Sequence, residues 1–389
     1  MGKLILTIAI AVCWSLSAAG QVIRIGLYHD RVVRSAVVYC ASGRYAVLGD
    51  GEELARMGQG EIFYISHSDG KLMAEGTNVQ FGPFSSFELK PLELMSAFRI
   101  RPVSPVAASR TFDDGLLLLA NDRFMTLVNM VDTDKYLAGV VESESGPNAR
   151  PEYYKAQALL ARTYAMKNLD KHQNEGFSLC DGVHCQAYKG KSVYNPEILK
   201  AVFETTGLIV ADQNYRLITA VFHSNSGGET QRGADVWISG EPYLQAVIDP
   251  YSIGQPNSRW QDTISFRQWK AYLVNNGMRS VGKLPDELLF VEQMHRKKYF
   301  ILDKDSLLMT KIRDDWHLKS AFFNMFPEGD RVIIMGKGYG HGIGMSQEGA
   351  MRMAVEGYSY TDIINFYFFD VKIMDYGELP RSERKEVSF

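Results

Sequence analysis

Cysteine is scarce in this sequence, with four residues among 389. Beyond the first twenty positions only Cys40, Cys180 and Cys185 remain. An odd number of cysteines makes a poor disulfide framework. An excess of positive charge is missing too, since 42 Lys and Arg stand against 45 Asp and Glu, for a formal net charge of −3. Because the chain has no basic run and no interleaved basic and aromatic stretch, we do not expect it to bind nucleic acid.

Long apolar runs are also missing. The run from Leu4 to Leu16 is too short to span a bilayer with any margin. It follows the positive Lys3 and precedes the small residues Ser17 to Gly20. This order predicts a signal peptide over residues 1–20, with export to the periplasm or cell envelope. An uncleaved leader would then be the only contact with a membrane.

The composition that remains is that of a globular protein, with 46% hydrophobic and 22% charged residues. Up to about residue 128, short β-prone runs alternate with turn signals such as Asp50-Gly51 and Asp69-Gly70. From Pro151 the apolar spacing becomes helical and predicts a helix to about Leu169. Further helices are predicted at 196–206, 266–275, 346–355 and 360–367. The fold class predicted is therefore α+β, with a β-rich N-terminal region followed by a mixed α/β domain.

Two acidic residues, Glu142 and Glu144, follow Val140-Val141, which predicts the end of a strand. Residues two apart in an extended segment share a face, so both carboxyls could point at one cleft. A glycosidase can use two carboxyls, but neighbours on one segment are too close and too parallel for that. One working carboxyl is the better hypothesis, and a solvated pair of loop acids is the alternative.

Two cations, Lys155 and Arg162, lie seven residues apart in the helix predicted from Pro151. They therefore share one helix face, two turns apart. The functional interpretation is a cationic stripe behind the glutamate, which would orient the acid or bind carboxylate and acetamido groups of a sugar. The alternative is an ordinary solvated helix face.

Soft metal ligands cluster in the next segment. Cys180, His184 and Cys185 lie within six residues, and His172 is a possible fourth ligand. Two thiolates and two imidazoles make a closed tetrahedral zinc set, and a zinc ion with four protein ligands is structural, since no position is left for water or substrate. A Cys180–Cys185 disulfide with bystander histidines is the alternative, and export would favour it.

A glycine-rich loop, Gly338-Tyr-Gly-His-Gly-Ile-Gly344, lies about 150 residues further along. It lacks the third glycine of a dinucleotide fingerprint and the Lys-Ser/Thr of a P-loop, so nucleotide binding is poorly supported. Alternating glycines let a backbone approach a ligand while Tyr339 and His341 share one side. A buried, satisfied His341 is the alternative. A triad around His223 and Ser224 is poorly supported, because no Gly-x-Ser-x-Gly elbow is present.

Together these segments resemble the stage II sporulation protein D family (SpoIID/LytB). The motifs keep their order and spacing over about residues 110 to 375. The segments that carry the resemblance are Tyr136–Glu144, Lys155–Ala165, Cys180–Tyr188, Ser224–Thr230 and Gly336–Gln347. The resemblance implies a lytic transglycosylase that cuts the bond between N-acetylmuramic acid and N-acetylglucosamine in bacterial cell-wall glycan. Its partners would be peptidoglycan strands, often already stripped of stem peptides, with a cell-wall amidase acting upstream.

Residue by residue, the resemblance places the catalytic acid at Glu144. Glu142 stands where the family usually has proline, so this chain has two candidate acids. The implied zinc ligands are Cys180, His184 and Cys185, with His172 as the fourth. The substrate-binding residues carried over or inferred beside them are Lys155, Arg162, Ser224, Tyr339 and His341, with Tyr339 in place of a frequent tryptophan.

The implied mechanism needs one acid. A protonated Glu144 donates to the glycosidic oxygen and then acts as base while the sugar's own 6-hydroxyl forms a 1,6-anhydro end. The implied organisation is a β-rich region at 21–110, a catalytic domain with a deep cleft at 111–376 and a polar tail at 377–389. Two other functions stay open: a non-catalytic glycan-binding scaffold of the same fold, and a zinc-dependent amidase.

Overall fold

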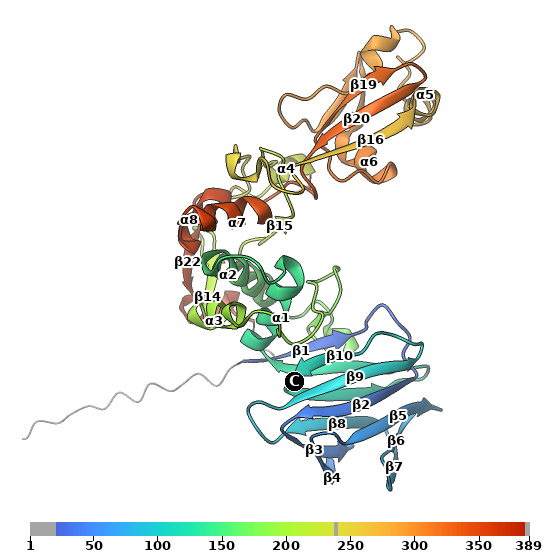
Figure 1. The fold of residues 1–389 in the computed structure, drawn as a ribbon, viewed down its shortest axis with the longest axis vertical. Helices are drawn as coiled ribbons and strands as arrows, with labels where there is room; N and C mark the ends of the chain where they lie inside the picture. The colour runs from blue at the N-terminus through green and yellow to red at the C-terminus, as the bar shows by residue number, and fades with distance from the viewer. Residues whose placement is uncertain (1–20, 237–239, 386–389) are drawn as a thin grey trace, which may run out of the picture.

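The structure is a computed structural model that describes residues 21–236 and 240–385. The predicted signal peptide, residues 1–20, lies outside the described residues, as do the last four residues of the predicted tail. Three parts follow one another along the longest axis: a β-rich part, a helical middle part, and a small α/β unit (Figure 1). The predicted α+β class is confirmed.

The β-rich part consists of two sheets. Their strands are β1 (Val22–Leu27), β2 (Ser35–Ser42), β3 (Arg44–Gly49), β4 (Glu52–Gly58), β5 (Ile62–Ser68), β6 (Lys71–Glu75), β7 (Gln80–Phe84), β8 (Ser86–Pro91), β9 (Ala97–Ser104), β10 (Arg110–Asp113), β11 (Gly115–Ala120), β12 (Met125–Asp132) and β13 (Leu179–Cys180). The order is β13-β1-β12-β11-β8-β3-β4 in one sheet and β10-β9-β2-β5-β6-β7 in the other. Side chains such as Phe63 of β5 and Phe87 of β8, whose ring centroids lie 6.0 Å apart, fill a core between them.

The first strand reaches across the predicted boundary at residue 110. β1 pairs antiparallel with β12 and parallel with β13, which carries Cys180. The predicted regions 21–110 and 111–376 therefore share a sheet. This pairing places the cysteine segment against the sheet, although it lies more than 150 residues from β1 in sequence.

The middle part is built around one buried helix. Its helices are α1 (Thr133–Ser145), α2 (Pro151–Lys167), α3 (Pro196–Glu204), α4 (Gly233–Val236), α7 (Gln347–Val355) and α8 (Tyr360–Tyr367), with the strand pairs β14 (Leu208–Ala211) with β22 (Lys372–Asp375) and β15 (Phe222–His223) with β21 (Met345–Ser346). α2 packs against α1, α3, α7 and α8. Its predicted buried stripe, which includes Ala158 and Ala161, is confirmed, and Tyr153 and Leu159 are buried as well.

One predicted element is wrong. The segment with Glu142 and Glu144 is not the end of a strand but the last part of α1. Asp132 caps this helix, because its side chain accepts from the N–H groups of Asp134 and Lys135. The β-branched pair Val140-Val141 favours a strand locally, but both residues are fully buried in the core, and this packing outweighs their weak local preference.

The small α/β unit has its own hydrophobic core, which includes Trp269, Leu273 and Ile334. Its elements are β16 (Arg259–Ser265), α5 (Phe266–Asn275), β17 (Tyr299–Leu302), β18 (Asp305–Leu308), α6 (Met309–Asp315), β19 (Phe323–Glu328) and β20 (Arg331–Lys337). Short 3-10 turns occur at Gln173–Glu175, Pro250–Ser252, Asp286–Leu289, Tyr376–Glu378 and Arg381–Glu383. Within the described ranges, no helix combines the length and apolar character that a bilayer crossing requires.

Candidate functional site

Glu144 lies in the last turn of α1 and is partly buried. The Ala187 N–H donates to its Oε1 at 2.9 Å. Burial raises the pKa of Glu144 above its usual value, an effect that the Ala187 hydrogen bond and the charge of Lys189 partly offset. A carboxyl that keeps its proton to higher pH is suited to act as a general acid.

The start of α7, directly after the glycine loop, reaches Glu144. Nε2 of Gln347 donates to the backbone oxygen of Glu144 at 3.4 Å, across 203 residues of sequence. Ser346 caps α7 at the same point by accepting from the Gly349 N–H. Beside them, the hydroxyls of Ser145 and Tyr153 lie 2.8 Å apart. The structure therefore brings the glutamate segment and the residues after the glycine loop together.

Glu142 does not share a face with Glu144. In a helix, residues two positions apart point about 200° away from each other around the axis. The expectation that both carboxyls share a face, which assumed an extended segment, was therefore wrong. Glu142 accepts from the N–H groups of Val193 at 3.0 Å and Tyr194 at 2.9 Å, and from the Ser192 hydroxyl at 3.0 Å. Through these hydrogen bonds, Glu142 holds the loop before α3 in place.

Replacing Glu142 by alanine is expected to destabilise the protein by about 1–3 kcal/mol, because several donors lose their acceptor. The remaining folded protein should keep its activity. Chemical denaturation and activity per folded molecule measure the two effects. An unchanged stability with lost activity would instead make Glu142 a second working acid.

The two cations on α2 form ion pairs with acidic residues other than Glu144. Arg162 is 3% exposed, pairs with Asp134 at 2.8 Å and donates to the Thr205 carbonyl just after α3 at 2.7 Å. Lys155 pairs with Glu152 at 2.8 Å and with Glu204 at 2.9 Å. Their contacts lie at the C-terminal end of α3, where carbonyl groups attract positive charge. A substrate-binding role for either cation stays a prediction.

Arg162→Ala is expected to cost about 3–5 kcal/mol of stability, because it leaves Asp134 buried without its counter-charge. Lys155→Ala, on the same helix but in a more exposed pair, should cost at most about 1 kcal/mol. Urea denaturation of both variants checks this. If Arg162→Ala were as stable as the wild type but had lost activity, this result would contradict a structural role for Arg162.

The four predicted metal ligands converge. Their ligand atoms lie within 4.8 Å of one another. Nε2 of His172 is 3.5 Å from Sγ of Cys185, and Nδ1 of His184 is 3.8 Å from Sγ of Cys180. Tetrahedral zinc, with bonds of about 2.3 Å to sulfur and about 2.0–2.1 Å to nitrogen, would hold S and N about 3.6 Å apart. The spacing of these residues therefore fits a zinc ion.

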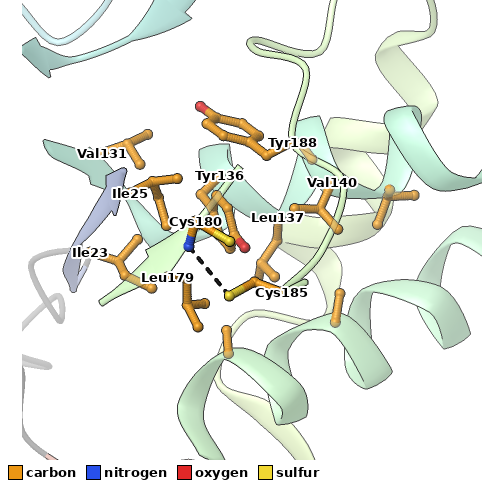
Figure 2. Packing of buried hydrophobic residues seen from close by; sticks show 14 of the residues in the cluster. Ile23, Ile25, Val131, Tyr136, Leu137, Val140, Leu179, Cys180, Cys185 and Tyr188 are labelled. Atoms are coloured by element: carbon orange, nitrogen blue, oxygen red, sulfur yellow. Dashed lines mark hydrogen bonds between the residues drawn. The ribbon is translucent and has the colours of Figure 1, made fainter. Parts of the chain in front are cut away.

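The surroundings of this cluster also suit a metal. Cys180 and Cys185 are free thiols. Figure 2 shows both beside Tyr136 and Leu137, with the Cys180 N–H pointing at Sγ of Cys185 at 3.4 Å. Glu175 holds Nδ1 of His172 at 2.5 Å, which leaves Nε2 directed toward the thiols. A carboxylate behind a histidine is the usual support of a metal-binding imidazole.

Both ring nitrogens of His341 form hydrogen bonds with backbone groups in or beside the glycine loop. Its Nε2 donates to the Phe222 carbonyl at 3.0 Å, and its Nδ1 accepts from the Ile343 N–H at 3.0 Å. Burial lowers the pKa of His341 to about 4, so it is neutral at pH 7. Gly338 needs its left-handed φ of 74°, and a Cβ there would lie 2.5 Å from the Asn225 carbonyl oxygen. His341 therefore stabilises the loop, and its contact with substrate stays a prediction.

Tyr339 pairs through its backbone with Asn225, and Ser224 directly precedes Asn225. Tyr339 is 45% exposed, and its backbone exchanges hydrogen bonds with Asn225. The Ser224 carbonyl accepts from the Glu348 N–H at 3.0 Å. His223 directs Nδ1 at the Ile343 carbonyl, 3.1 Å away, and not at Ser224. The arrangement gives no support to a serine triad.

Sequence reasoning missed three contacts of Glu144: Ala187, Lys189 and Gln347. Two of them follow the ligand Cys185 by only two and four residues, which was the available signal. The four candidate metal ligands therefore lie directly before the segment whose N–H group reaches the candidate acid. Gln347 is the first residue of α7, three residues after the glycine loop, and a single local pattern could not have placed it.

Comparison with known proteins identifies several similar sequences. The family model described as "Stage II sporulation protein" matches residues 121–211. Stage II sporulation protein D of Bacillus subtilis (strain 168) is 31% identical over 265 residues, covering 64% of this chain and 76% of that relative. The protein of the same name from Bacillus amyloliquefaciens is 32% identical over the same shares. The "Amidase enhancer" of Bacillus subtilis is 29% identical over 292 residues, 62% of this chain and 40% of that protein. At this identity and coverage, the chain belongs to the stage II sporulation protein D family.

Proposed function

We propose that this chain is an exported peptidoglycan lytic transglycosylase that uses Glu144 as its single acid and base. Membership of the stage II sporulation protein D family associates it with cell-wall degradation. The observation that carries the finer proposal is the setting of Glu144. It is a partly buried carboxyl with a raised pKa, and it is joined through Gln347 to the glycine loop.

The reaction starts with a protonated Glu144, which donates to the oxygen that links N-acetylmuramic acid to N-acetylglucosamine. As that bond breaks and positive charge develops at the anomeric carbon, the 6-hydroxyl of the same sugar attacks. The ionised Glu144 takes up the hydroxyl proton and is restored. Such intramolecular attack gains up to about 7–11 kcal/mol from proximity. The product is a 1,6-anhydro end, and no water is consumed.

A single carboxyl fits this chemistry better than a hydrolytic pair. Glu142 is occupied by the loop before α3. Asp181, the acid in the Cys180–Tyr188 motif, pairs with Arg110 at 2.7 Å and accepts from the Tyr28 N–H at 2.7 Å. Both acids have structural partners, which supports a mechanism that needs only Glu144.

A structural zinc ion is part of the proposal. His172, Cys180, His184 and Cys185 would use all four positions of a tetrahedral ion, so none would remain for water or substrate. The ion would supply rigidity to the segment that carries Ala187, and this chain's own N–H group would orient Glu144. We also propose that a cell-wall amidase works on the same glycan, in keeping with the relative named amidase enhancer.

The test is a digestion of purified glycan strands followed by mass analysis of the new ends. The expected products carry anhydro ends, 18 Da lighter than reducing ends because no water is added. Reducing ends would overturn the lytic mechanism and indicate a hydrolase. Binding without any cleavage would favour a glycan-binding scaffold of the same fold.

A further inference from the structure

Three cations lie on segments that meet next to the glycine loop, at the root of the small α/β unit. Arg259 of β16 lies directly opposite Lys337 of β20 in the antiparallel ladder, so the two side chains share one face of the sheet. The Lys319 ammonium lies 5.8 Å from the centroid of the Tyr339 ring, and the Lys319 carbonyl accepts from the Gly340 N–H at 2.9 Å. We call Arg259, Lys319 and Lys337 the basic cluster.

The basic cluster has no carboxylate partner within the described part of the chain. Its members make no ion pair there, although Lys337 stacks on the Phe322 ring at 4.7 Å. Glu348 is held by the neighbouring Asn257, whose Nδ2 donates to it at 2.7 Å. Like charges directly opposite in a sheet are destabilising, and this chain carries a net charge of −3. An uncompensated basic pair in such a chain fits an anion that arrives from outside.

The position of the basic cluster connects it to the candidate active site. The Gly338 N–H donates to the Ser258 carbonyl at 3.0 Å, so the ends of β16 and β20 meet the glycine loop. That loop continues to Gln347, which contacts Glu144. Figure 1 shows β16 and β20 running together from the middle part into the small unit. A polymer bound at Glu144 could therefore extend past Tyr339 and onto this unit.

Tyr339 adds an aromatic surface beside the charges of the basic cluster. Its ring is 45% exposed, and its backbone is fixed by two hydrogen bonds with Asn225, of 2.8 and 3.1 Å. An exposed aromatic ring with a fixed backbone is a stacking surface for the apolar face of a sugar, and a cation beside such a ring is favourable in itself. Stacking and charge together select a sugar that carries a carboxylate.

We infer that the basic cluster and Tyr339 form a glycan subsite that binds the lactyl carboxylate of an N-acetylmuramic acid residue away from the bond that is cut. This inference rests on the proposed function, since it takes cell-wall glycan as the ligand. It assigns the small α/β unit a direct role in holding the strand. The cluster orients no reacting atom, so it acts on substrate binding and not on the chemical step.

The test compares the triple variant Arg259→Gln/Lys319→Gln/Lys337→Gln with a matched control, Arg267→Gln/Lys283→Gln/Lys304→Gln. The control removes the same charge from exposed positions of the same unit, away from the ladder pair. Purified glycan strands are used with free carboxyls and after conversion of the carboxyls to amides. On free-carboxyl strands we expect the triple variant to raise KM about five- to fiftyfold with kcat within about twofold. The control should leave both constants unchanged.

On amidated strands the wild type should already show the high KM, and the triple variant should add nothing. An equal effect of the triple variant on both substrates, or an equal effect of the control, would overturn the inference. Direct binding to the Glu144→Gln protein separates this result from the proposed function. If the wild type cuts no glycan, the enzyme proposal fails, but carboxylate-dependent binding that needs Arg259, Lys319 and Lys337 would still support the subsite.

Discussion

Glu144→Gln is expected to lower glycan cleavage by about 10²–10⁴-fold while leaving glycan binding intact. The amide keeps the shape of the side chain and can still accept from the Ala187 N–H, but it cannot give a proton to the leaving oxygen. Cleavage rates on glycan strands and binding to the same strands measure the two effects. Glu142→Gln, the same change two residues earlier, is the matched control and should keep most of the activity.

The pH dependence of the same pair of proteins sharpens this prediction. Because the pKa of Glu144 is raised by burial, the proton needed for catalysis is present below that pKa, and activity is lost as the pH rises through it. Above it, the ionised carboxyl also destabilises the folded protein relative to its form at low pH. Glu144→Gln should therefore have an equal or higher melting temperature at pH 8, and this difference should shrink toward acid. A variant that lost cleavage because it melted earlier would contradict the assignment.

Loss of the metal is expected to reduce stability and cleavage together. Cys185→Ser, or chelation of the wild type, should cost several kcal/mol and lower the melting temperature by at least about 5 °C. The reason is that Cys185 is two residues from Ala187, whose N–H group holds Glu144. Metal content, melting temperature and cleavage measured at the same chelator concentrations check the coupling. About one zinc ion per chain is expected before treatment.

Cys40→Ser is the control for the metal prediction. Cys40 is buried in β2, and its thiol points at the Ser42 and Gly43 carbonyls at 3.6 and 3.3 Å. A hydroxyl can keep these contacts, so metal content and cleavage should not change. Cleavage lost well before the fold would indicate a catalytic metal and thus an amidase-like enzyme. Thiols of Cys180 and Cys185 that react only after reduction would indicate a disulfide.

Local signals in the sequence were sufficient for several elements. Helices predicted at 266–275 and 360–367 are α5 and α8 with the same bounds. Proline at the first turn and helical apolar spacing place α2 from Pro151. The convergence of His172, Cys180, His184 and Cys185 was also predictable, because three of these four candidate ligands lie within six residues and their chemistry is specific. In each case the signal lies within a single short segment of the chain.

The sequence by itself determined the α+β class and the main helices, and it predicted the four residues that come together as a possible metal site. Through the resemblance it also predicted the candidate acid. Only the tertiary structure decided that Val140-Val141 lie in a helix, because their burial depends on distant elements. It also decided that Glu142 fastens a loop, that Arg162 pairs with Asp134, and that Gln347 meets Glu144. These outcomes depend on contacts between residues 28 to 203 positions apart. A local sequence pattern does not specify which of two similar side chains, such as Glu142 and Glu144, will make such a distant contact.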